Sequence, residues 1–180
     1  MFEAPQLDET ARDAMRIASA ALDEAEGRGD PYEMSQALVL VARGFARLQA
    51  AASVEAYLER ALRWARQLRS IDMTVDLLCE LADAAERLAQ AQDAERPGQG
   101  HAARERSRDH AFEASLLAGH VADPDWEIRV LLRISDVLDR CGDRDDAVQM
   151  QARALRLMSG SNEGALDPHV MPGLGRLADS

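Results

Sequence analysis

The chain has 180 residues, of which 47% are hydrophobic and only 4% aromatic, and its formal net charge is −11. This length and apolar content are sufficient for one domain with a buried core. The negative charge argues against nucleic acid or an anionic membrane surface as the main partner, because phosphate groups are bound by Lys and Arg.

Other features of the whole chain favour a reducing cytosol, and the Ala- and Arg-rich composition is compatible with a bacterial source. No run approaches the ~20 apolar residues that a membrane span needs. The first residues, MFEAPQLDE, lack the basic and then apolar order of a signal peptide. Two cysteines, Cys79 and Cys141, are too few for a disulfide framework. We therefore expect a cytoplasmic protein that does not bind membranes.

The first predicted helix covers residues 8–27, with Met15, Ala18 and Leu22 on one side. It ends at a Gly-Arg-Gly sequence. Asp30 and Pro31 then form a strong helix-start signal, because Asp is a good N-cap and Pro suits the first helical position. A helical hairpin is predicted over residues 30–69.

A second hairpin is predicted over residues 70–121. Its first helix follows Ser70 and carries Leu78 and Leu81 on its apolar side. Its second helix is displaced by an insertion, AQDAERPGQGHAA, in which Pro97-Gly98-Gln99-Gly100 is typical of a loop.

The third hairpin, residues 123–158, has the clearest pattern. Leu131, Ile134, Ser135 and Leu138 fall on one helical face, and Gly142 then supplies a left-handed C-cap. Asp143 follows as an N-cap for the second helix of this hairpin.

The first and third hairpins are related by a constant offset. Leu38 corresponds to Leu131 (131 − 38 = 93), and Ala61 corresponds to Ala154 (154 − 61 = 93). The Asp-Pro start signals share this offset, and the middle copy begins 40 residues after the first (78 − 38 = 40). A shared register across caps and both helices indicates an internal repeat.

This pattern resembles the tetratricopeptide repeat, in a variant with longer helices. The resemblance implies an all-α fold, a right-handed superhelical stack of antiparallel hairpins with about seven helices, forming a single domain over residues 1–158. Residues 159–180 form a Gly/Pro/Ser-rich tail. Within it, residues 168–178 are expected to fold back as a short capping helix through Val170, Met171, Leu174 and Leu177.

No constellation of residues points to catalysis, a metal or another cofactor. His101, His110 and His120 fall on different faces of one helix. The aspartates that follow Gly142 lack the remaining ligands of a calcium loop and are better explained as caps. Inert thiols are the expected state of Cys79 and Cys141. We therefore expect a protein that is not an enzyme.

The resemblance places a groove on the first helices of the hairpins. The charged residues assigned to partner binding there are Arg43, Arg47, Glu80, Asp83, Arg87, Arg129, Arg133, Asp136 and Arg140. The same rule places Gln36, Val39, Asp76, Cys79 and Glu86 in the groove. In the alternative interpretation, Arg43, Glu80, Asp83 and Arg133 pair between adjacent helices and only solvate the surface.

The function that the resemblance implies is binding of a peptide or partner protein in this groove. Three alternatives stay open: a type III secretion chaperone, which shares the length and acidic charge but has a more aromatic groove; a self-assembling structural subunit, including a homodimer; and a small-molecule sensor domain. An apolar cleft of ~300 Å³ or more with few polar groups would favour the sensor.

Overall fold

The computed structural model describes residues 4–163, with side chains for residue 9 and residues 11–160. These residues form seven α-helices and no strand, so the all-α prediction is confirmed. The helices are α1 (Ala4–Arg28), α2 (Pro31–Arg47), α3 (Ala51–Leu68), α4 (Ile71–Glu95), α5 (His101–Ala118), α6 (Pro124–Cys141) and α7 (Arg144–Glu163).

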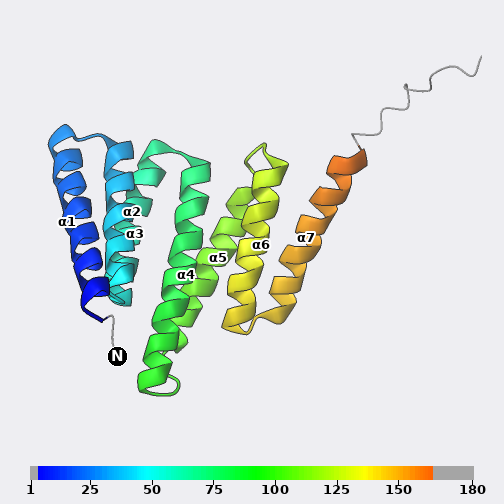
Figure 1. The fold of residues 1–180 in the computed structure, drawn as a ribbon. Helices are drawn as coiled ribbons and strands as arrows, with labels where there is room; N and C mark the ends of the chain where they lie inside the picture. Colours follow the sequence, from blue (N-terminus) through cyan, green and yellow to red (C-terminus); the bar gives the residue numbers. More distant parts are fainter. Residues whose placement is uncertain (1–3, 164–180) are drawn as a thin grey trace, which may run out of the picture.

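The helices are arranged in two layers that the chain visits alternately (Figure 1). Each helix packs against the next in sequence, and α4 also contacts α6. In Figure 1, α2, α4 and α6 share the nearer layer, α3 and α5 lie behind them, and α1 and α7 form the two ends of the row. This packing of successive antiparallel helices is consistent with a helical repeat.

The predicted start signals of α2, α4 and α6 form side-chain caps. Asp30 accepts hydrogen bonds from the backbone N–H of Tyr32 (2.7 Å) and Glu33 (3.2 Å). Asp123 accepts one from Trp126 (3.0 Å), and the Ser70 hydroxyl accepts one from Met73 (3.4 Å). These bonds satisfy N–H groups that the first turn of a helix otherwise leaves free.

The core consists of branched apolar side chains and alanines that allow close helix approach. Leu38, Leu78 and Leu131 are fully buried. Ala61 and Ala154, the repeat-related pair, are also fully buried, as expected for positions where two helices come close together.

The insertion between the two helices of the middle hairpin is mostly helical, and the loop predicted at residues 97–100 within it is confirmed. The chain leaves the helices only at residues 96–100. Asp93 holds this turn by accepting hydrogen bonds from the N–H groups of Gly98 (3.0 Å) and Gly100 (2.8 Å). A Cβ at Gly100 would lie 2.3 Å from the Ala89 carbonyl oxygen, so a glycine is needed there.

The two ends of the described chain differ from the predicted boundaries. α1 begins at Ala4 instead of residue 8, and α7 continues to Glu163, past the predicted end at residue 158. The predicted capping helix at residues 168–178 lies outside the described residues. None of the helices in residues 4–163 has the length and apolarity of a membrane span.

Candidate functional site

A cavity of about 720 Å³ lies between α2 and α4. It forms because α2 packs on α1 and α3, whereas α4 packs on α3, α5 and α6, so α3 separates the two helices from behind. Apolar, polar and charged side chains all contribute to its walls: Tyr32, Ser35, Gln36, Val39 and Arg43 from α2, Leu68 from the end of α3, Ser70 from the connection, Asp72, Met73, Asp76, Leu77 and Glu80 from α4, and Arg133 from α6.

A chain of ion pairs crosses one end of this cavity and joins three helices. Glu80 lies at its centre, with its Oε1 4.0 Å from the Arg43 Nη2 and 3.5 Å from the Arg133 Nη2. Arg133 also donates to the Asp83 Oδ2 from both Nη2 (2.8 Å) and Nε (3.1 Å). Arg140 donates to the other oxygen of Asp83. We call these five side chains the ion-pair ladder.

The opposite end of the cavity holds two carboxylates that form no ion pair with any described residue. Asp72 accepts a hydrogen bond from the Ser70 hydroxyl, and this bond together with the Met73 N–H lowers the pKa of Asp72. Asp76 keeps an exposed edge, but the cavity walls partly remove it from water and raise its pKa. Arg133 opposes this shift, and the like charges of Asp72 and Glu80 add to it.

The structure brings some of the predicted groove residues together and leaves others apart. The ion-pair ladder contains five of them: Arg43, Glu80, Asp83, Arg133 and Arg140. The alternative interpretation of the sequence expected all of these except Arg140 to pair between adjacent helices. The predicted residues that form no ion pair within the described chain are all on the same three helices: Arg47, Arg87, Arg129 and Asp136.

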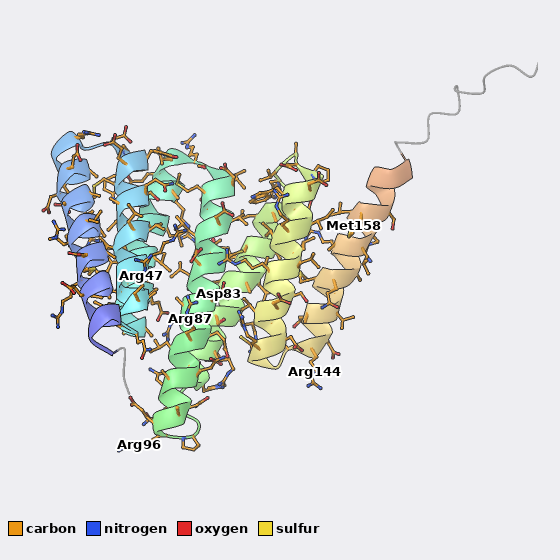
Figure 2. All side chains as sticks on the ribbon, viewed as in Figure 1. Arg47, Asp83, Arg87, Arg96, Arg144 and Met158 are labelled. Carbon is orange, nitrogen blue, oxygen red and sulfur yellow. The ribbon has the colours of Figure 1, made fainter. Side chains whose placement is uncertain are left out.

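Arg87 lies on α4 beside the ladder. It lines a smaller pocket of about 160 Å³ together with Asp83 and Arg140. Figure 2 shows Asp83 and Arg87 one helical turn apart on α4, with Arg47 on the neighbouring α2. Arg47, Arg129 and Asp136 are exposed and line none of these pockets.

Two residues assigned to the groove are buried instead. Cys79 and Glu86 each expose only 2% of their surface. The reason is that α4 is the central helix and packs against α3, α5 and α6, so less of its circumference remains open. Glu86 is satisfied inside the protein by Gln90 Nε2 at 3.1 Å and the Cys141 Sγ at 3.4 Å.

Neither thiol is activated in this environment. Burial raises the pKa of Cys79 to about 12 and that of Cys141 to about 11. Both groups are therefore protonated near neutral pH, and a protonated thiol is a poor nucleophile. The described residues contain no group of three or more His, Cys, Asp or Glu side chains placed to hold a metal ion.

The cavity extends one helical turn beyond the groove predicted from sequence. Tyr32, Asp72 and Met73 line it, and all three lie in the first turns of α2 and α4. Sequence reasoning could have found these residues, because they follow the predicted caps Asp30 and Ser70. The first turns of neighbouring helices lie at the rim of a helical layer, so residues in them can line a cavity there.

Comparisons with known proteins identify no family. No family model matches the chain, and no curated protein matches it. Among solved structures, the "DHF58 filament" is 23% identical over 87% of this chain and 84% of its own, with a TM-score of 0.45. BtubC from P. vanneervenii is 17% identical over 97% and 83% of the two chains, with a TM-score of 0.33. MamA is 16% identical over 91% and 99%, with a TM-score of 0.27. These values are too low to support an argument about this chain.

Proposed function

We propose that this chain is a non-catalytic, cytoplasmic module of the tetratricopeptide type that binds a segment of a partner protein. The bound segment lies in the cavity between α2 and α4, on the concave side of a right-handed stack of hairpins. The observation that carries this proposal is the 720 Å³ cavity itself, whose walls come mainly from α2 and α4, with Leu68 of α3 and Arg133 of α6. A surface built on packed helices is preorganised, which lowers the entropic cost of binding.

The lining indicates the chemistry of the bound segment. Val39 and Met73 are half-buried and offer an apolar wall, while Asp72 and Asp76 form no ion pair within the described chain. A segment that carries an Arg or Lys next to an aliphatic side chain would complement both features. The positive charge would also interact favourably with Asp76, whose pKa is raised because its surroundings partly remove it from water.

The cavity is less suited to the small-molecule sensor alternative. It exceeds ~300 Å³, but its walls include five charged side chains, namely Arg43, Asp72, Asp76, Glu80 and Arg133. Pockets for small molecules are usually lined mainly by apolar groups. The acidic excess also disfavours anions such as nucleotides, whose phosphates require cationic groups.

A peptide-display selection on the immobilised protein tests this proposal. The chain contains 21 arginines and no lysine. An amine-reactive biotin reagent therefore couples only at the α-amino group and leaves the cavity unmodified. We expect the enriched peptides to share a basic residue beside an apolar one. Their affinity should fall as salt is raised, because the charges involved are partly exposed.

Matched charge-reversal variants locate the binding surface. Asp76→Arg should weaken binding of an enriched peptide by about tenfold or more, because it places like charges together. Asp23→Arg makes the same charge change on the exposed surface of α1 and should leave the affinity within about twofold. Peptides that bind both variants equally, or acidic peptides that are lost on Arg43→Glu, would contradict the proposed site.

A further inference from the structure

The outer face of α7 exposes a row of large apolar side chains. Val148 and Leu155 each retain 60% exposure and Met158 retains 49%. α7 packs on α6, and it ends the row of described helices (Figure 2). We call Val148, Leu155 and Met158 the α7 row.

The internal repeat shows whether the equivalent side chains in the first hairpin are exposed or buried. With the offset of 93, Leu155 corresponds to Leu62 in α3 (155 − 93 = 62), and Met158 corresponds to Ala65 (158 − 93 = 65). Leu62 and Ala65 are buried, at 5% and 0% exposure, in a helix against which α4 packs. Leu155 and Met158 of the α7 row therefore occupy positions that are buried in the first hairpin. The third member, Val148, corresponds to Glu55 (148 − 93 = 55), which is also buried and pairs with Arg106 of α5.

The sequence that follows α7 contains a matching start signal. Two Asp-Pro pairs, Asp30-Pro31 and Asp123-Pro124, begin α2 and α6 directly after α1 and α5. The third Asp-Pro pair of the chain is Asp167-Pro168, and it is followed by four large apolar residues, namely Val170, Met171, Leu174 and Leu177.

The connection has a suitable length. One residue, Gly29, separates α1 from its Asp-Pro pair, and residues 119–122 separate α5 from the next pair. Asp167 comes four positions after Glu163, the last described residue of α7 (167 − 163 = 4). Short connections place consecutive helices side by side.

We propose that residues 167–178 cover the α7 row within the same molecule, with Asp167-Pro168 starting the segment. Pro172 has no N–H with which to bond the Pro168 carbonyl, and Gly173 and Gly175 are poor helix formers. The segment is therefore held by packing of its apolar side chains on the α7 row. This proposal is independent of the cavity between α2 and α4.

Truncation and point variants test the cover. Termination after Glu163 keeps all the described residues of α7. The shortened chain should unfold at a lower urea concentration, and its apparent mass in light scattering should rise with protein concentration. Leu174→Asp should lower the unfolding midpoint by a similar amount. His169→Asp introduces the same carboxylate at a polar position of the same segment and should leave the midpoint unchanged.

A double-mutant cycle distinguishes a direct contact from a general effect. Leu155 is exposed enough for Leu155→Asp to fold, and this variant should lower the midpoint as Leu174→Asp does. Because both changes break one contact, the double variant should show clearly less than the sum of the two shifts. Additive shifts would overturn the proposal. A full-length dimer that dissociates on Leu155→Asp but not on truncation would also overturn it, since a second copy would then cover the α7 row.

Discussion

At the scale of single residues, most buried charges of this protein are paired across helices. Glu55 on α3 is 7% exposed and receives two hydrogen bonds from Arg106 on α5, at 2.6 Å and 3.0 Å. Buried carboxylates need such compensation, because transfer of a charge out of water is costly. The two unpaired carboxylates at the end of the large cavity differ in that they keep access to solvent.

His110 is a half-buried titratable residue that lacks such compensation at one ring nitrogen. Its Nε2 is buried and has no hydrogen-bond partner in the described part of the chain. Burial lowers its pKa below the ordinary value of 6.5, and the nearby acidic groups Glu55, Glu113, Glu59 and Asp109 only partly offset this shift. The folded protein therefore favours neutral His110.

This environment predicts a specific pH dependence of stability. With a folded-state pKa below the unfolded value of 6.5, the unfolded chain binds the proton first as the pH falls. The stability contribution of neutral His110 is thus present above about pH 6.5 and is lost as the pH decreases toward the folded-state pKa. His110→Gln should flatten the dependence of the urea midpoint on pH between 7 and 5.

His101 is the matched control for this measurement. It lies on the same helix with a largely exposed side chain, and His101→Gln should keep the wild-type pH dependence. Equal pH profiles for wild type and His110→Gln would show that the buried imidazole does not titrate as described.

At the scale of elements, the helices and their starts were predictable, because caps and apolar spacing are local properties. Asp30, Ser70 and Asp123 cap the helices that they were predicted to start. The path of the insertion at residues 91–103 was less predictable. Its apolar and polar residues do not show how far α4 extends, and the turn depends on the contacts of Asp93 and Gly100 with residues on either side of it.

Gly100, in the turn between α4 and α5, and Gly160, in α7, give a paired prediction about the effect of an added Cβ on stability. Gly100→Ala places a Cβ 2.3 Å from a backbone oxygen, so it should destabilise the protein by ~1–3 kcal/mol. Gly160 lies within α7 with open space around it, so Gly160→Ala should be neutral or stabilise by up to ~1 kcal/mol. Urea unfolding measures both changes. A loss from Gly160→Ala as large as that from Gly100→Ala would contradict this description of the α4–α5 turn.

At the scale of the whole molecule, the surroundings of the cavity were only partly predictable from sequence. The repeat register assigns Val39, Asp76 and Glu80 to a groove, and these three residues line the cavity. It does not indicate that Cys79 and Glu86 are buried, because this depends on α4 contacting α6 as well as α3 and α5. Contacts between the first helices of successive hairpins are set by packing angles, which a one-dimensional pattern does not contain.

The ion-pair ladder connects separate hairpins, and its contribution to stability should depend on salt. Asp83 is shared by Arg133 and Arg140, and its side chain is 19% exposed. Asp83→Ala should lower the free energy of unfolding by ~1 kcal/mol at low salt and by less at 1 M NaCl, since salt screens partly exposed charges. Asp136→Ala removes an exposed carboxylate without an ion pair in the described chain and should have little effect at either salt concentration. A salt-independent loss for Asp83→Ala would mean that its packing matters more than its charge.

The way in which each helix packs on its neighbour in sequence also bears on how the protein folds and opens. Apart from the contact between α4 and α6, the main packing in residues 4–163 joins consecutive helices, so little chain entropy is lost in closing long loops. The α4–α5 hairpin has the most extensive packing and lies in the middle of the row, which makes it the expected nucleus of folding. Local unfolding then begins at the ends. Because α3 packs less extensively on α4 than on α2, the segment α1–α3 can separate from α4 while the later helices remain folded. A partner that contacts α2 and α4 together would therefore suppress amide exchange in the first half of the chain more than in the second.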